Sequence, residues 1–219
     1  MVHTRVKICG ITNTEDALKA SFYGAWAVGF VFHKKSPRYV SPSKARKIIE
    51  SLPPFITPVG VFVDLNERAV RDICQFTRIR CVQFHGREDQ VYCKRFGDYK
   101  IIKAFRVDDA FNVETVKKYK VDAYLFDAFV DGIQGGTGQT FNWNIIKGVS
   151  FDKPVILSGG LSAANIREAI ETLHPYAVDV SSSLEQTAGI KNPKLIKEFF
   201  DEINKILLES QQKPGDVLK

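Results

Sequence analysis

Eight short segments rich in β-branched and aromatic residues alternate with segments of helical pattern, which predicts a single α/β domain, a (β/α)8 TIM barrel. Eight units in 219 residues give about 27 residues per unit, within the usual range for this barrel. An open doubly wound sheet would need fewer strands and, to bind a dinucleotide, the sequence GxGxxG, which is absent. We therefore predict one barrel over residues 1–209, followed by a polar tail over residues 210–219.

Glycine, proline or a helix-capping side chain bounds each predicted element. We expect strands over residues 5–9, 26–32, 58–64, 81–85, 100–107, 123–126, 154–157 and 177–180. We expect helices over residues 15–23, 41–52, 66–77, 89–96, 112–120, 142–148, 162–173 and 193–208. The loop over residues 130–142 is the most glycine-rich part of the chain and is expected to be mobile.

The composition is that of an ordinary soluble globular protein, with 44% hydrophobic and 26% charged residues. The longest apolar run, residues 25–32, is far shorter than the roughly 20 residues that a membrane helix needs. The first residues include His3, Arg5 and Lys7 and show no apolar signal core. We therefore expect a cytoplasmic protein with no membrane partner.

Cys9, Cys74, Cys81 and Cys93 form no CxxC pair, so reduced thiols are the expected state. Neither these cysteines nor the four histidines have the ligand spacing of a structural zinc site. We expect no metal and no cofactor. The net charge of +6 favours an anionic ligand but also suits nucleic acid, so by itself it decides little.

Side chains at the ends of the predicted strands are candidate catalytic groups, because barrel active sites lie where the strands end. Strand periodicity places Cys9 on one face with Arg5 and Lys7, an unusual environment for a core thiol. Each candidate also has a plain structural interpretation: a cysteine packs as a small apolar residue, an aspartate caps a helix, and a loop arginine is solvated. The candidates are Cys9, Arg38, Asp64, His85, Asp127 and Ser181.

Two loops in the last two units have the composition of a phosphate site. Gly159 and Gly160 follow the seventh strand, and Ser181, Ser182 and Ser183 follow the eighth. Glycine lets backbone N–H groups approach an anion, and barrels frequently bind phosphate with these two loops. A phosphorylated small-molecule substrate is therefore expected.

An ordered set of motifs over about residues 5 to 200 carries a resemblance to a known family. These motifs are Lys7-Ile8-Cys9-Gly10-Ile11-Thr12, Ser36-Pro37-Arg38, Val82-Gln83-Phe84-His85-Gly86, Asp127 with Gly135-Gly136-Thr137-Gly138 and Phe141-Asn142-Trp143, Ser158-Gly159-Gly160-Leu161 and Val178-Asp179-Val180-Ser181-Ser182. Together they resemble the phosphoribosylanthranilate isomerases of tryptophan biosynthesis.

The resemblance implies an Amadori rearrangement of N-(5-phosphoribosyl)anthranilate to 1-(2-carboxyphenylamino)-1-deoxyribulose 5-phosphate. Carried over by position, Cys9 is the general base, Asp127 the general acid and Arg38 the contact for the anthranilate carboxylate. We expect His85 and Asp179 to contribute to substrate binding and the two loops to hold the phosphate. Other enzymes of tryptophan biosynthesis are possible partners, and nucleic acid is not expected.

Strand parity also predicts a buried ion pair. If Cys9 points into the barrel mouth, Lys7 points inward one layer below it and needs a partner. The first and eighth strands are neighbours in a closed barrel, so Asp179 is the natural candidate. A cation at this place would also help to lower the thiol pKa.

The chain departs from the family pattern at Ser158, Ser183 and Asn192, where alanine, glycine and aspartate are usual. A side chain at 183 could crowd the phosphate or give it a hydroxyl. A second enzyme interpretation is another phosphosugar barrel, for example indole-glycerol-phosphate synthase, but the lysine and glutamate pair usual for that enzyme is not found at matching strand ends. The net charge and Lys34-Lys35 also leave open a barrel that binds anions or nucleic acid without catalysis.

Overall fold

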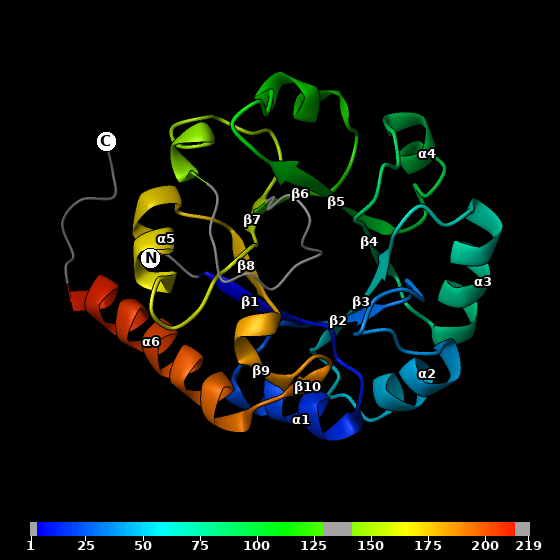
Figure 1. Cartoon of the computed structure of the whole chain (residues 1–219), viewed down its shortest axis with the longest axis horizontal. Helices are drawn as coiled ribbons and strands as arrows, with labels where there is room; N and C mark the ends of the chain where they lie inside the picture. Colours follow the sequence, from blue (N-terminus) through cyan, green and yellow to red (C-terminus); the bar gives the residue numbers. More distant parts are fainter. Residues whose placement is uncertain (1–3, 129–141, 213–219) are drawn as a thin grey trace.

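A closed barrel of eight parallel strands forms the centre of the computed structural model, which describes residues 4–128 and 142–212 (Figure 1). The strands are arranged in sequence order, and β1 pairs with β8 to close the barrel. They are β1 (Arg5–Cys9), β2 (Ala27–Val31), β3 (Thr57–Phe62), β4 (Cys81–Phe84), β5 (Lys100–Val107), β6 (Ala123–Ala128), β7 (Val155–Leu157) and β8 (Ala177–Val180). The predicted fold is confirmed.

Helices surround the barrel and begin where the sequence supplies capping side chains. Asn13, Ser41 and Asn66 each accept a hydrogen bond from a backbone N–H of the helix that follows, which satisfies one unpaired donor of its first turn. The helices are α1 (Thr14–Tyr23), α2 (Pro42–Glu50), α3 (Glu67–Thr77), α4 (Gln90–Lys94), α5 (Ile166–Leu173) and α6 (Pro193–Gln212). Among the described residues, no helix has both the length and the apolar character needed to cross a membrane.

Two predicted α-helices are instead short 3₁₀ helices, Val113–Lys118 and Trp143–Ile145. The first contains Val113, Thr115 and Val116, whose branched side chains lower helix propensity. A third 3₁₀ helix, Ser182–Leu184, follows β8. The predicted loop over 130–142 lies outside the described residues except for Asn142.

The C-terminal part of the chain differs most from the prediction. α5 begins at Ile166, four residues later than predicted, and α6 continues to Gln212, past the predicted start of the tail. A small hairpin, β9 (Glu185–Thr187) with β10 (Ile190–Lys191), was not predicted. It lies beside α1 in Figure 1, where the backbone N–H of Lys191 donates to Asp16 at 2.8 Å.

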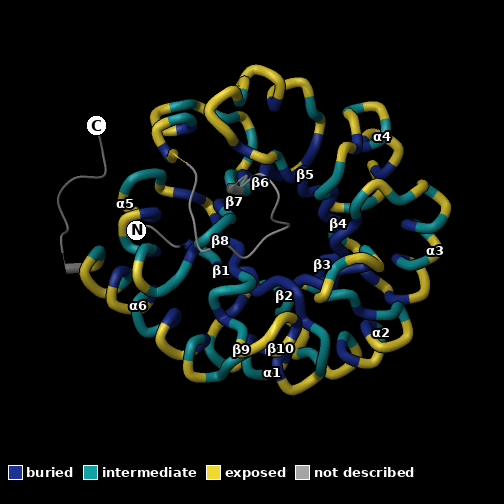
Figure 2. The backbone as a smooth tube through the Cα atoms, viewed as in Figure 1, coloured by how far each residue is buried: buried dark blue, intermediate teal, exposed yellow. Residues whose placement is uncertain are grey.

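Alternation along the strands divides the buried side chains between two places. Side chains that point outward, such as Val6, Ile8 and Val178, pack against the helices, and Figure 2 shows the buried ring of strands inside a partly exposed ring of helices. A second group fills the lower part of the barrel interior: Val59, Ile102, Ala104, Ala123, Leu125, Ile156 and Ala177. Toward the ends of the strands, the interior holds the buried polar residues Lys7, Gln83 and Asp179 and a small cluster of Cys9, Val31 and Val61.

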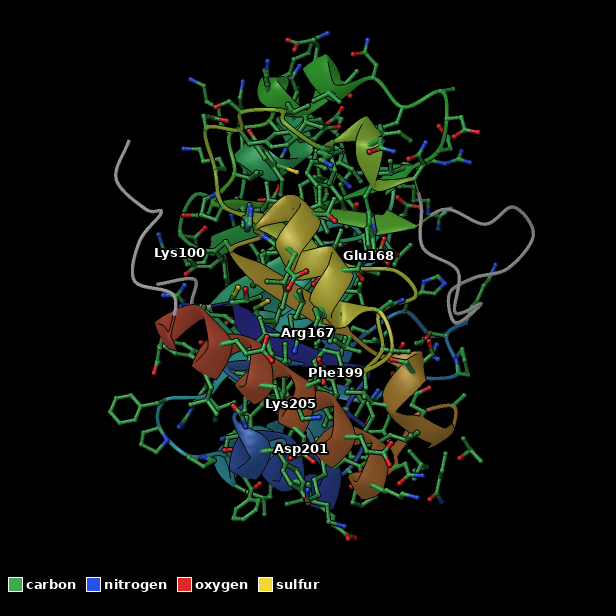
Figure 3. All side chains as sticks on the ribbon, turned by 90° about the vertical axis from the view of Figure 1, so that its left-hand side faces the viewer. Lys100, Arg167, Glu168, Phe199, Asp201 and Lys205 are labelled. Carbon is green, nitrogen blue, oxygen red and sulfur yellow. The ribbon has the colours of Figure 1, made fainter. Side chains whose placement is uncertain are left out.

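α5 and α6 pack side by side against the outside of the barrel (Figure 3). Arg167 on α5 contacts Glu202 at 2.9 Å and Glu209 at 2.6 Å on α6. Exposed ion pairs of this kind contribute at most about 1 kcal/mol each. The buried residues Phe199 and Ile203 of α6 therefore hold the helix in place chiefly by apolar packing.

Candidate active site

The buried pair of Lys7 and Asp179 lies inside the barrel where β1 meets β8. Lys7 and Asp179 are register partners, and the Lys7 Nζ donates to both carboxylate oxygens, at 2.8 and 2.9 Å. Their side chains are only 5% and 4% exposed. Burial disfavours the Lys7 ammonium, but attraction from Asp179 and from the Cys9 sulfur outweighs it, and the pKa of Lys7 is raised. The predicted ion pair is confirmed.

Cys9 lies above this pair, at the end of β1, and packs against Val31 and Val61. Burial raises the pKa of the Cys9 thiol, and Asp179 adds to that effect. Lys7 and Lys191 lower the pKa, as expected of nearby cations, but they do not cancel the effect of burial. The expected influence of Lys7 is therefore present, yet the net shift of the thiol pKa is upward.

Gly29 on β2 leaves the space that the thiol occupies. It is the register partner of Cys9, and a Cβ at this position would lie 2.7 Å from the Cys9 Sγ and 3.0 Å from the Lys7 Nζ. Carbon atoms cannot approach sulfur that closely without displacement. The absence of a side chain at position 29 thus allows the thiol and the ammonium to sit together.

A second polar group lies across the barrel at the ends of β4 and β6. Asp127 and His85 are joined by a hydrogen bond of 3.0 Å between Oδ2 and Nε2. The other ring nitrogen, Nδ1, is 2.8 Å from the Nε2 of Gln83, a fully buried residue one layer below. If the Gln83 amide donates to Nδ1, the hydrogen of a neutral His85 ring is on Nε2 and points to Asp127. The positions of Cys9, His85 and Asp127 at one end of the barrel agree with the prediction.

Arg38 extends from the loop after β2 over the end of β1. Its Nε and Nη2 donate to the carboxylate of Glu185 at 2.9 and 2.8 Å, and Lys191 donates to the same carboxylate at 2.9 Å. Burial opposes the charge of Glu185, but Arg38 and Lys191 overcome it, and the pKa of Glu185 is lowered. Burial lowers the pKa of Lys191, against the pull of Glu185.

The sequence prediction missed Gln83, Glu185 and Lys191. Strand parity places Gln83 on the inward face with His85, a signal that could have identified it. Glu185 and Lys191 lie on the unpredicted hairpin and carry no comparable local signal.

The two predicted phosphate loops follow the neighbouring strands β7 and β8 and are joined by a hydrogen bond. Gly159 and Gly160 have positive φ angles of 88° and 64°, a conformation that favours glycine. Their backbone N–H groups make no hydrogen bond with the described residues. The Ser183 hydroxyl donates to the carbonyl of Leu161, and the Ser181 hydroxyl donates to the carbonyl of Cys9 at 3.1 Å. Ser182 begins the 3₁₀ helix that follows β8.

Three other positions have structural roles. Asp64 accepts a hydrogen bond from the backbone N–H of Arg87 at 2.6 Å, so this strand-end aspartate joins two loops. Asn192 accepts from the backbone N–H of Lys194 at 2.9 Å at the start of α6. The Ser158 backbone N–H donates to the carbonyl of Phe126 at 2.8 Å. The three departures from the family pattern are Ser158, Ser183 and Asn192. None of them replaces Cys9 or Asp127, the candidate groups for proton transfer.

Known proteins are similar to the chain over nearly its whole length. Residues 6–202 match the family model for N-(5'-phosphoribosyl)anthranilate (PRA) isomerase. A relative from Geobacter sulfurreducens, an N-(5'-phosphoribosyl)anthranilate isomerase, is 48% identical over 195 residues, which cover 89% of this chain and 96% of the relative. One from Marinomonas sp., with the same name, is 44% identical over 200 residues, or 90% of this chain and 97% of the relative.

Solved structures agree with the sequence matches. The phosphoribosyl anthranilate isomerase of Thermotoga maritima superposes with a TM-score of 0.86 at 39% identity, and covers 93% of this chain and 100% of its own. A phosphoribosyl anthranilate isomerase in complex with reduced 1-(o-carboxyphenylamino)-1-deoxyribulose 5-phosphate has a TM-score of 0.80 at 36% identity, with the same coverage.

Proposed function

Because the chain belongs to the N-(5'-phosphoribosyl)anthranilate isomerase family, we propose that its Cys9 and Asp127 carry the proton transfers of that reaction. The enzyme is an aldose–ketose isomerase of tryptophan biosynthesis. It converts N-(5'-phosphoribosyl)anthranilate to 1-(o-carboxyphenylamino)-1-deoxyribulose 5-phosphate. One observation supports this assignment most. The Cys9 thiol lies beside the Lys7 ammonium at one side of the barrel end, and the Asp127 carboxyl is hydrogen-bonded to the His85 imidazole at the other.

Asp127 acts first in this mechanism. It donates a proton to the ring oxygen of the ribose, the bond from that oxygen to the anomeric carbon breaks, and a protonated Schiff base to the anthranilate nitrogen forms. The carboxyl of Asp127 must hold a proton before this step, and its Oδ2 can still accept from the Nε2–H of His85, 3.0 Å away. Gln83 fixes the His85 ring so that Nε2 faces the carboxyl.

Cys9 then acts as the base. Its thiolate removes the proton from the adjacent sugar carbon, the electron pair moves to the Schiff base, and an enolamine forms. The enolamine tautomerises to the ketone. The thiol pKa is raised by burial, so the thiolate depends on the positive charge of Lys7, which is itself fixed by Asp179.

The two ends of the substrate carry negative charge and give the enzyme two places to hold it. Arg38 would bind the anthranilate carboxylate, and the loops with Gly159, Gly160 and Ser181 to Ser183 would bind the phosphate through N–H and hydroxyl groups. His85 would then lie between these ends, facing the sugar, and Asp179, whose carboxylate is held by Lys7, would contribute to binding from the layer below. Fixing both ends aligns the reacting carbon with its acid and base.

Cellular context is a further part of the proposal. We propose that the enzyme works in the cytoplasm, where its four cysteines, which form no disulfide, would stay reduced. Association with other enzymes of tryptophan biosynthesis stays a prediction. Pull-down of the tagged enzyme from cells in which those enzymes are expressed would test it.

Turnover of freshly prepared phosphoribosylanthranilate, followed by the loss of its fluorescence, tests the main proposal. We expect Cys9→Ala and Asp127→Asn each to lower kcat by about 10²- to 10⁴-fold, the range for a single general acid or base. The exposed Glu15→Gln variant is the control and should keep the full rate. Full activity of either active-site variant would contradict the assignment, and phosphate binding by an inactive wild type would favour a non-catalytic barrel.

A further inference from the structure

We propose that Glu185 is the positioning residue that makes Arg38 selective for an aromatic carboxylate. The inference rests on the proposed role of Arg38 and extends it. Glu185 holds one edge of the Arg38 guanidinium and thereby turns the other edge toward the substrate. The carboxylate at the ortho position of the aryl ring is the group that this second edge would bind.

A guanidinium has two edges that can form paired hydrogen bonds, and Glu185 occupies one of them. The Nε of Arg38 lies 2.9 Å and 3.2 Å from the two carboxylate oxygens, and Nη2 lies 2.8 Å from Oε2. Nη1 makes no hydrogen bond with the described residues, so the edge formed by Nη1 and Nη2 is available. A second carboxylate can therefore bind there with paired hydrogen bonds.

The pair is buried enough to be well defined. The Glu185 and Arg38 side chains are 4% and 15% exposed. The aliphatic stem of Arg38 crosses Gly10, where a Cβ would lie 2.7 Å from the Arg38 Cδ. Gly10 directly follows Cys9 in the chain, so this contact places the stem of Arg38 beside the end of β1 that carries the proposed base.

Lys191 supplies a positive charge that offsets the negative charge of Glu185. Arg38 and Glu185 alone would form a neutral pair, and the negative charge of Glu185 would repel an incoming carboxylate. Lys191, whose side chain is fully buried, lies 2.9 Å from Glu185 and donates to the carbonyl of Ser181 at 3.0 Å. Its positive charge offsets that of Glu185, and its second bond anchors the cluster to the loop after β8.

Binding of two matched ligands separates positioning from a general structural effect. The first ligand is reduced 1-(o-carboxyphenylamino)-1-deoxyribulose 5-phosphate, and the second is the same compound without the aryl carboxylate. Loss of a charged hydrogen-bonded contact weakens binding by about 10-fold or more, since 10-fold corresponds to about 1.4 kcal/mol. We expect Glu185→Gln to raise the Kd of the first ligand by about 10-fold or more and the Kd of the second by less than about 2-fold.

Three further variants complete the experiment. Arg38→Met should also raise the Kd of the carboxylated ligand selectively, and by a larger factor than Glu185→Gln. Lys191→Met should raise it selectively by a smaller factor, because each variant alters the same cluster. Glu114→Gln on the exposed 3₁₀ helix removes the same charge far from the site and should change neither Kd. In turnover, Glu185→Gln should raise KM more than it lowers kcat, and Glu185→Asp should restore part of the loss.

The outcomes distinguish this inference from the proposed function beneath it. If Arg38→Met affects both ligands equally, Arg38 does not bind the carboxylate and that part of the proposed function fails. If Arg38→Met is selective but Glu185→Gln weakens both ligands equally, Glu185 only supports the fold and our inference is overturned. Should Glu185→Gln fail to fold, the selectivity of Lys191→Met decides between the same two outcomes.

Discussion

Gly29 and Cys9 face each other across the β1–β2 pair, and a Cβ at position 29 would lie 2.7 Å from the Cys9 Sγ. The space for the thiol is therefore created on a neighbouring strand. We expect Gly29→Ala to displace the thiol and the Lys7 ammonium, to lower kcat by about 10-fold or more, and to cost about 1–3 kcal/mol of stability through overpacking.

Gly97→Ala is the matched control for this prediction, because the nearest atom to a Cβ there is 3.9 Å away. Steady-state turnover and urea denaturation of both variants provide the measurement. A Gly29→Ala enzyme with the stability and kcat of the Gly97→Ala enzyme would show that the barrel interior accommodates the methyl group without moving the thiol.

Removing one partner of the Lys7–Asp179 pair should lower the free energy of unfolding more than removing both. Lys7→Met leaves the Asp179 carboxylate buried without its two hydrogen bonds, which typically costs about 3–5 kcal/mol. The double variant Lys7→Met/Asp179→Leu should recover much of that stability but none of the activity, because the thiolate would still lack its cation. A double-mutant cycle by urea denaturation measures the coupling, and additive costs would contradict it.

Alkaline pH should destabilise the fold through its thiols. Burial raises the pKa of Cys74 to about 12, and of Cys81 and Cys93 to about 11, above the value of about 8.5 in an unfolded chain. Between these values the unfolded state has released its thiol protons while the native state keeps them. The unfolded state then binds fewer protons, so the free energy of unfolding falls as the pH rises above about 8.5.

Urea denaturation at pH 7.5, 9 and 10.5 measures this slope. Each thiol contributes up to about 1.4 kcal/mol per pH unit within its window. Cys81→Ala, at a partly exposed position, should reduce the slope by one thiol's share. A free energy of unfolding that stays constant or rises over this range would contradict the prediction.

Gln83 should affect kcat rather than substrate binding. It holds the Nδ1 of His85 at 2.8 Å and so orients the ring toward Asp127. Gln83→Leu removes that bond by replacing the polar amide with an apolar side chain of similar size. We expect kcat to fall by about 10-fold, part of the 10²- to 10⁴-fold of the acid itself, with KM nearly unchanged. An altered KM at constant kcat would instead place Gln83 in substrate binding.

The sequence determined the strands, the barrel and the residues at the ends of the strands, because alternation and capping are local properties of the chain. It located Cys9, His85 and Asp127 through the strand ends, and it identified the Lys7–Asp179 pair because parity and barrel closure follow from topology. The α-helices that the sequence predicted after β5 and β6 were wrong, because short 3₁₀ helices form there instead.

Contacts between distant segments could not be predicted in this way. Arg38 and Glu185 are 147 residues apart, and the hairpin that brings them together has no strong strand pattern. The net rise of the Cys9 pKa was also beyond the sequence, because it depends on how burial compares with two neighbouring cations. The chain alone thus set which chemical groups reach the end of the barrel. Tertiary packing decided their charge, their partners and the space around them, since each of these depends on atoms brought together only by folding.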